Sequence, residues 1–336
     1  MTQAVIAIHG GAGTITRAAM DANREREYTA ALEQVLLAGQ RVLAEGGSAL
    51  DAVTEAVRLL EDCPLFNAGK GAVLTHAGTF ELDAAVMDGA TRNAGAVACV
   101  TRVRNPVLAA RAVLEHSEHV LFAADGAEAF AEAQGLELVA PDYYFTQARY
   151  DQWQRAQAST GMALLDHDAA ALAAKAAQAT QATQATQVTE AGTDPIDPDK
   201  KFGTVGAVAC DAQGNLAAAT STGGVTNKQV GRVGDTPVFG AGCYADDVAA
   251  VSATGTGEMF IRTVAAYDVS AQMRYAGLSL EESARRVVME KLVAIEGRGG
   301  LIAVDRQGNV TLPFNTEGMY RGVARVGEPV SVLIYG

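Results

Sequence analysis

Thr204 is the residue of this chain whose type and position offer the clearest chemistry. It opens the apolar run 204–210, which directly follows a long polar segment. A threonine hydroxyl is a poor nucleophile until a base takes its proton. A free α-amine, with a pKa of about 8, can be that base when threonine is residue one. We therefore hypothesise a cut between Gly203 and Thr204. Periodicity alone favours a simpler interpretation, in which Thr204 is only the β-branched first residue of a strand.

Histidine-based catalysis finds little support. The five histidines form no HExxH motif, and the chain has neither a GxSxG elbow nor a Walker loop. His9 precedes the glycine-rich turn 10–13, which could cradle a ligand but matches no phosphate-binding pattern. A single histidine is more often a structural hydrogen-bonding residue than a catalytic one, and we interpret His9 in this way. His116 and His119 lie three apart on a predicted helix without a third metal ligand nearby, and we assign them to a solvated helix face.

Charged residues in glycine-rich loops are the remaining candidates. Asp83 and Asp88 border a predicted strand and its turn, where they either satisfy turn backbones or act in catalysis. Arg232 and Asp235 stand in the polar loop 227–235. Taken alone, these two residues favour an exposed i,i+3 ion pair.

Composition limits the classes of function. The chain has 336 residues, 49% hydrophobic and 19% charged, with a formal charge of −13 at pH 7. This acidic balance argues against nucleic acid and anionic membranes as partners, and no apolar run approaches the roughly 20 residues of a membrane span. Four cysteines without a CxxC pair predict free thiols. Because the N-terminus lacks a basic region followed by a cleavable apolar segment, we expect a cytoplasmic protein.

The elements that must position these residues come in blocks. Before the polar segment, we expect a strand at 5–8, a helix over 25–44, a helix between Ser48 as N-cap and Pro64, strands over 79–89 and 94–103, and a helix over 106–130. After it, we expect a hairpin of strands 204–210 and 216–221, a strand over 238–244, a long helix N-capped by Thr254 or Thr256, a helix over 279–296, and strands at 301–304, 310–312 and 330–334. Such blocks argue for a layered α+β fold in a single domain, 1–336.

The polar segment 158–200 is predicted to be a flexible linker. It consists largely of alanine, glutamine, threonine and acidic residues, with three consecutive Gln-Ala-Thr units in 178–186. Alanine is too small to anchor a core. A cut near the end of such a linker would be tolerated.

Seven short segments occur in an order that resembles one family. They are His9–Gly13, Phe66–Gly69, Glu81–Asp83 with Met87–Gly89, Gly203–Ala209, Thr220–Gly224, Gly231–Asp235 and Thr254–Gly257. Together they are similar to the plant-type L-asparaginase and isoaspartyl-peptidase family of N-terminal nucleophile hydrolases, over nearly the whole chain. The resemblance implies a four-layer αββα sandwich. It also implies that a precursor cleaves itself into an α subunit (1–203) and a β subunit (204–336), which assemble as a dimer of αβ heterodimers.

The resemblance implies catalytic roles for five residues. Thr204 corresponds to the nucleophile, and Thr222 to the threonine that orients it. Thr254 and Gly255 correspond to the oxyanion hole, with a hydroxyl and a backbone N–H donated toward the developing charge. Asn67 corresponds to an asparagine near the nucleophile.

Substrate and cation sites follow from the same resemblance. Arg232 corresponds to the residue that grips the substrate α-carboxylate, and Asp235 to the one that pairs with the α-ammonium. No cofactor is implied for catalysis. A structural sodium ion is implied, bound by the backbone carbonyls of Leu60, Glu61, Cys63, Phe66, Ala68 and Lys70. Lys70 departs from the small or apolar side chain that we expect there.

The function implied is hydrolysis of β-aspartyl dipeptides and L-asparagine through a threonine acyl-enzyme. Two alternatives remain at this point. One is a glycosylasparaginase, which the lack of a signal peptide disfavours. The other, from a different class, is a non-enzymatic protein that binds a ligand through its glycine loops.

Overall fold

The structure is a computed structural model that describes residues 3–158 and 203–336. Apart from Ala158, the predicted linker 158–200 lies outside the described residues. All four cysteines are free thiols, as predicted. Within the described ranges, no helix is long and apolar enough to cross a membrane.

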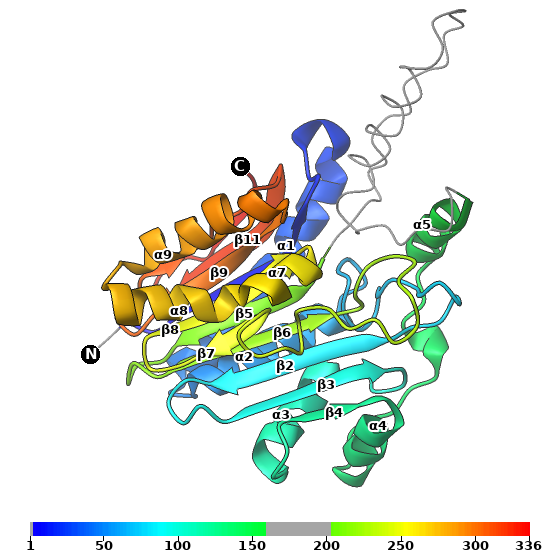
Figure 1. Cartoon of the computed structure of the whole chain (residues 1–336), viewed down its shortest axis with the longest axis horizontal. Helices are drawn as coiled ribbons and strands as arrows, with labels where there is room; N and C mark the ends of the chain where they lie inside the picture. The colour runs from blue at the N-terminus through cyan, green and yellow to red at the C-terminus, as the bar shows by residue number, and fades with distance from the viewer. Residues whose placement is uncertain (1–2, 159–202) are drawn as a thin grey trace, which may run out of the picture.

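The strands form two sheets that lie one over the other (Figure 1). The larger sheet has eight strands in the order β12-β11-β1-β5-β6-β2-β3-β4, and the smaller has four in the order β10-β9-β8-β7. Among the described residues, neighbouring strands of these sheets are antiparallel except β3 and β4, which are parallel. The strands are β1 (Val5–Gly13), β2 (Leu82–Asp88), β3 (Ala94–Val100), β4 (Leu121–Ala123), β5 (Val205–Cys210), β6 (Leu216–Thr222), β7 (Cys243–Ala245), β8 (Ala249–Gly255), β9 (Gly299–Asp305), β10 (Val310–Thr311), β11 (Gly318–Arg325) and β12 (Ser331–Tyr335).

Helices flank both sheets (Figure 1). Those before the polar segment are α1 (Ala22–Ala44), α2 (Ala49–Asp62), α3 (Pro106–His116), α4 (Ala124–Ala133) and α5 (Gln147–Ala158), and those after it are α7 (Gly257–Thr263), α8 (Ala265–Ala276) and α9 (Leu280–Arg286). Ser48 caps α2 as predicted: its hydroxyl accepts from Asp51 N, and the Asp51 carboxylate accepts from Ser48 N in return. This reciprocal pair satisfies backbone donors that the first turn leaves open.

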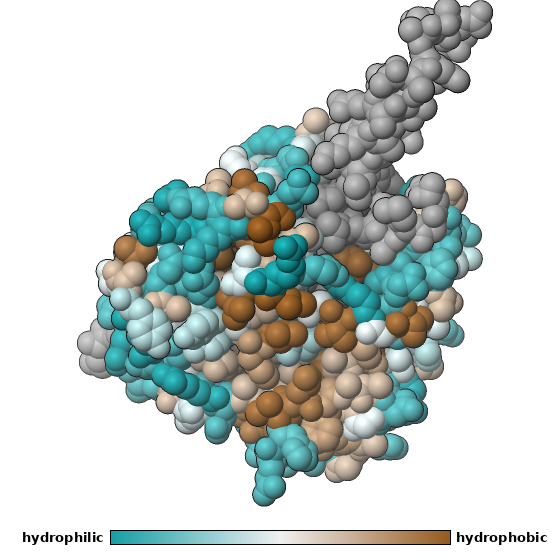
Figure 2. Space-filling model, viewed as in Figure 1, coloured by the Kyte–Doolittle hydropathy of each residue, from teal (hydrophilic) through white to brown (hydrophobic). Residues whose placement is uncertain are grey.

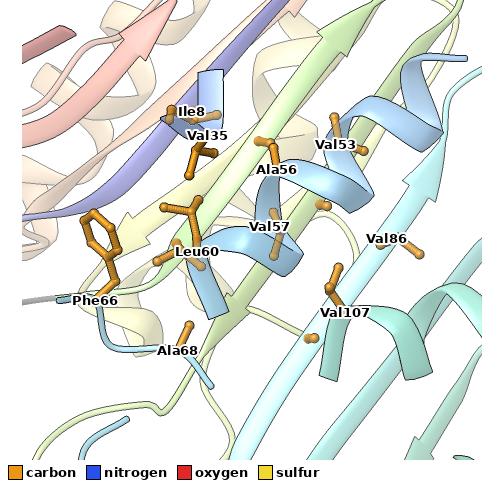
Figure 3. Packing of buried hydrophobic residues seen from close by; sticks show 14 of the residues in the cluster. Ile8, Val35, Val53, Ala56, Val57, Leu60, Phe66, Ala68, Val86 and Val107 are labelled. Atoms are coloured by element: carbon orange, nitrogen blue, oxygen red, sulfur yellow. The ribbon is translucent and has the colours of Figure 1, made fainter. Parts of the chain in front are cut away.

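Three buried apolar clusters hold these elements together. The first joins the larger sheet to helices α1 to α4, the second lies between the two sheets, and the third joins the smaller sheet to α7, α8 and α9. Strand β1 contributes to two of them, because Ile6 and Ile8 face the helices whereas Val5 and Ala7 face the other sheet. Figure 3 shows side chains of α2 packed among those of β1, β2 and α3.

Two of the predicted helices are interrupted. The prediction of one helix over 106–130 is wrong, because α3 ends at His116 and the next residues form β4, which pairs with β3, and then α4. His116 and His119 therefore do not share a helix face. After β8, Val264 adopts a left-handed conformation (φ 50°), which divides the expected long helix into α7 and α8. The N-cap of α7 is Thr256, whereas Thr254 lies inside β8.

The predicted strand 238–244 is also largely wrong. Only Cys243–Ala245 is a strand. The residues that precede this strand form turns, because the backbone N–H groups of Val238 and Gly242 both donate to the carbonyl of Asp235, at 3.0 and 3.1 Å. Strands β8 and β11 were not anticipated. The predicted hairpin after Thr204 is confirmed as β5 and β6.

Candidate active site

The β5–β6 hairpin brings Thr204 beside Thr222. Thr204 immediately precedes β5, Thr222 ends β6, and the register pairs Val205 with Ser221. The two threonines are buried, and Thr204 Oγ1 donates to Thr222 Oγ1 at 3.2 Å. Thr222 Oγ1 also accepts from the backbone N–H of Gly224 at 2.9 Å. These bonds fix the orientation of the Thr204 hydroxyl, and all of their partners belong to one hairpin and the turn that follows it.

The bond between Gly203 and Thr204 lies against both sheets. Gly203 has φ +91°, and a Cβ atom built on it would lie 2.9 Å from Thr254 Oγ1 in β8 and 3.0 Å from Gly11 Cα in β1. The pairing of β1 with β11 shifts register between His9 and Ala12, which places Gly11 in this irregular stretch. The glycine-rich stretch 10–13 is therefore not the predicted turn but the end of β1, and it approaches the chain at Gly203, where only a small residue fits.

Thr254 directs an unused polar atom into this region. Its side chain is fully buried, and its Oγ1 has no hydrogen-bond partner among the residues described. A buried hydroxyl normally finds a partner, because leaving it without one costs free energy. A lone donor beside Gly203 suits a negative charge that forms only during a reaction.

A pocket opens beside Thr204 and collects most of the predicted residues. Six of the eight predicted catalytic, cleavage and substrate residues line it: Gly203, Thr204, Thr222, Arg232, Asp235 and Gly255. Thr254 precedes Gly255 in β8, and Asn67 lies behind the pocket wall.

Arg232 and Asp235 do not form the loop ion pair that their spacing favours. The Arg232 guanidinium donates to Glu258 through Nε and Nη2, at 3.0 Å each. Asp235 is buried, and its Oδ2 lacks a partner within residues 3–158 and 203–336. Burial raises the pKa of Asp235 to about 7, although the nearby Arg232 charge opposes this. The pocket therefore offers a carboxylate that a ligand cation would complete.

Asn67 acts on the backbone around the pocket. Its Nδ2 donates to the carbonyl of Gly224 at 2.7 Å, and its Oδ1 accepts from Val73 N at 3.0 Å. Its own carbonyl accepts from Gly223 N at 3.0 Å. Asn67 thus fixes the turn that follows Thr222.

His9 is a buried structural residue, as the sequence suggested. Its Nε2 lies 2.9 Å from Ser252 Oγ, which in turn lies 2.8 Å from Thr220 Oγ1. Burial lowers the pKa of His9 to about 3, against the opposing effect of a backbone contact with Thr204. The imidazole is therefore neutral near pH 7. Asp88 also follows the simpler interpretation, because its carboxylate accepts from Ala90 N and the Thr91 hydroxyl in a turn.

The loop after α2 has features that fit a carbonyl-bound cation. A Cβ built on Gly69 would lie 2.4 Å from the carbonyl oxygen of Glu61, and one built on Gly71 would lie 2.8 Å from that of Phe66. The glycines thus pack against backbone carbonyls, which are donors that hard cations prefer, although the Glu61 carbonyl already accepts from Lys70 N at 2.7 Å. The Lys70 ammonium lies 5.8 Å from the centre of the Tyr143 ring. Among the described residues, no cluster of three or more His, Cys, Asp or Glu side chains could hold a metal ion.

Three polar residues near the pocket were missed from the sequence. Glu258 pairs with Arg232 from the first turn of α7, Lys228 lies in the loop that carries Arg232, and Glu81 bonds to that loop from the residue before β2. Glu81 stands inside one of the family-like segments, and Glu258 directly follows another. Lys228 lies in the polar loop 227–235, and its neighbours in the sequence do not indicate that it is buried.

Comparison with known proteins identifies the class. The family model described as asparaginase matches residues 2–334. The chain belongs to this asparaginase family. It is 57% identical to an isoaspartyl peptidase of Salmonella typhimurium over 100% of this chain and 99% of that protein, and 56% identical to one of Escherichia coli over 100% and 97%. A protein of Arabidopsis thaliana named probable isoaspartyl peptidase/L-asparaginase 2 is 41% identical over 98% of each chain.

Proposed function

We propose that this chain is a self-cleaving amidohydrolase that acts on β-aspartyl dipeptides and L-asparagine. The observation that carries the proposal is that the Thr204 hydroxyl, held by Thr222, lies in one pocket with Arg232 and Asp235. Beside it lies the Thr254 hydroxyl, which has no partner in the part of the chain that the structure describes. The relatives named isoaspartyl peptidase support the substrate class, since they align over the full length of this chain.

Self-cleavage would use the same hydroxyl as catalysis. Thr204 Oγ1 attacks the carbonyl carbon of Gly203, and the hydroxyl proton passes to the departing nitrogen of Thr204. The peptide bond becomes an ester, which water hydrolyses to the Gly203 carboxylate and the free Thr204 hydroxyl and α-amine. The products are an α subunit (1–203) and a β subunit (204–336) in one domain.

Substrate hydrolysis would follow with the new α-amine as the base. It takes the hydroxyl proton as Thr204 Oγ1 attacks the side-chain carbonyl of the substrate. The Thr254 hydroxyl and the Gly255 N–H donate to the oxyanion, and the leaving amine takes up the proton. Water then hydrolyses the acyl-enzyme by the same path.

Selectivity would come from holding both α-substituents of the substrate. Arg232 binds the α-carboxylate with its planar fork, and Asp235 binds the α-ammonium. With both groups held, one additional methylene would misplace the carbonyl, so glutamine is expected to be a poor substrate.

The three apolar clusters favour the finer architecture of this class, a four-layer αββα sandwich. For assembly we propose a dimer of αβ heterodimers. Figure 2 shows apolar residues gathered in the middle of one face, and exposed apolar side chains include Val230, Val264 and Tyr267, which are 60%, 45% and 37% exposed. Burying exposed apolar side chains of this kind would favour self-association.

We also propose that the loop 60–70 binds sodium, through the carbonyls of Leu60, Glu61, Cys63, Phe66, Ala68 and Lys70. Such an ion would stabilise the loop that carries Asn67 and would take no part in the reaction. The midpoint temperature of thermal unfolding is expected to be higher in sodium chloride than in choline chloride at equal ionic strength.

Comparison of wild type with Thr204→Ala tests the proposed function. Wild type should hydrolyse β-aspartyl-leucine and L-asparagine, and Thr204→Ala should stay uncut and hydrolyse neither. If glycosylated asparagine is the substrate preferred by wild type, the glycosylasparaginase alternative replaces this proposal. Hydrolysis of β-aspartyl-leucine by Thr204→Ala would overturn the nucleophile assignment.

A further inference from the structure

The loop 227–235, which carries Arg232, also contains a buried lysine. Lys228 follows β6 and has no exposed surface, which is unusual for a lysine. Its Nζ donates to the backbone carbonyl of Glu81 at 2.7 Å, just before β2 begins. Burial lowers the pKa of Lys228, and the charges of Asp83 and Glu81 oppose that effect. A buried lysine is retained at a cost in stability, which suggests a specific task.

Glu81 holds the same loop at a second point. Its Oε2 accepts from the backbone N–H of Gly231 at 2.9 Å, and its side chain is only 7% exposed. Gly231 has φ +81°, and the next residue is Arg232. Glu81 therefore binds Lys228 through its carbonyl and Gly231 through its carboxylate, which fixes both ends of the segment 228–231.

Lys228 also supports the pocket wall. A Cβ atom built on Gly224 would lie 2.8 Å from Lys228 Nζ and 2.8 Å from its Cδ. Gly224 lines the pocket, and its N–H donates to Thr222. The lysine thus fills the space behind the turn between the nucleophile hairpin and the Arg232 loop.

We propose that Lys228 and Glu81 are positioning residues that set the Arg232 loop, and thereby determine how tightly the enzyme holds the α-carboxylate of its substrate. This inference rests on the proposed function. Their effect falls on binding, because within residues 3–158 and 203–336 their side chains bond to Glu81 O and Gly231 N and not to Thr204 or Thr254. Self-cleavage needs no grip on an α-carboxylate and should be insensitive to the pair.

Steady-state kinetics of Glu81→Ala test the proposal. The variant removes the acceptor of Gly231 N but leaves the carbonyl that Lys228 uses. We expect KM for L-asparagine to rise about tenfold, the factor that corresponds to a lost hydrogen bond to a charged group, with kcat and the self-cleavage rate unchanged. Glu81→Gln keeps an acceptor oxygen and should recover most of the KM. Glu33→Ala, on an exposed position of α1, is the matched control and should behave as wild type.

Two further measurements keep the proposal open to refutation. Hydrogen exchange of a peptide covering 229–235 should be faster in Glu81→Ala than in wild type, whether or not the enzyme is active. Lys228→Met should give the same KM-selective loss and serves if Glu81→Ala does not fold. Unchanged KM and exchange would overturn the proposal, as would a fall in kcat or self-cleavage at constant KM. An inactive wild type would instead refute the proposed function, and the exchange result would still decide the role of the pair.

Discussion

Replacing Thr254 by valine is expected to change the stability of the protein and its catalytic rate in opposite directions. The Thr254 hydroxyl is fully buried, and no residue in the described ranges bonds to it. Valine keeps the branched shape and removes only the group that needs a partner. We expect Thr254→Val to maintain or stabilise the fold while it removes one oxyanion donor.

The stability effect can be bounded. A buried polar group without a partner costs about 1–3 kcal/mol of the free energy of unfolding. Self-cleavage would change the molecule being unfolded, so the comparison needs Thr204→Ala as a common background. In that background, Thr254→Val should raise the free energy of unfolding by about 1 kcal/mol or more, measured by urea titration.

The catalytic effect has the opposite sign. With Thr204 intact, Thr254→Val should slow self-cleavage and lower kcat for β-aspartyl-leucine by about 10²–10³, equivalent to about 2.7–4 kcal/mol of transition-state stabilisation. Gel time courses and ninhydrin detection of the released amine measure the two rates. Thr254→Ser retains the hydroxyl and should recover most of both.

Either of two results would refute this reasoning. If Thr254→Val lowers the free energy of unfolding relative to Thr204→Ala alone, the hydroxyl has a structural partner. If kcat is unchanged in the cleaved enzyme, Thr254 is not an oxyanion donor.

Three more expectations follow from the pocket. Since Asp235 binds an ammonium only as a carboxylate, KM for L-asparagine should rise as pH falls through about 7, where its pKa lies in the empty pocket; a flat KM between pH 6 and 8 would contradict this. Because folding raises that pKa, the carboxyl group destabilises the fold increasingly as pH rises to about 7 and by a constant amount above it, so Asp235→Asn should unfold at a higher urea concentration at pH 8 while KM rises. Gly203→Ala should slow self-cleavage at least about tenfold, since left-handed backbone costs alanine about 1–2 kcal/mol and its Cβ would press on Thr254 and Gly11; a normal cleavage time course would show that this approach is unimportant.

Local signals in the sequence were sufficient for part of the site. The hairpin that pairs Thr204 with Thr222 needs only two apolar runs and a short turn, 211–215, and all of these are visible in the sequence. The start of α2 was equally local, since Ser48 and Asp51 cap each other. Such elements depend on neighbours within a few residues.

Elements decided by distant partners were not predictable. β11 lies between β12 and β1 and is largely buried, so it lacks the alternation of an exposed strand. β4 is three residues long and exists because it pairs with β3, a contact that helical spacing over 106–130 conceals.

Side-chain partners were the least predictable feature of the site. Spacing suggested that Arg232 pairs with Asp235, yet its carboxylate partner is Glu258, 26 residues further along the chain. Lys228 resembled a solvated loop residue and is fully buried. Both outcomes follow from the packing of α7 and β2 against the loop, and sequence spacing carries no information on that packing.

Denaturing mass spectrometry of the purified full-length chain tests the central claim most directly. We predict that the 34.8 kDa chain converts on incubation into two fragments, 1–203 and 204–336, with Thr204 at the new N-terminus and no conversion in Thr204→Ala. A wild-type chain that stays intact after prolonged incubation, or one that is cut elsewhere, would contradict the account.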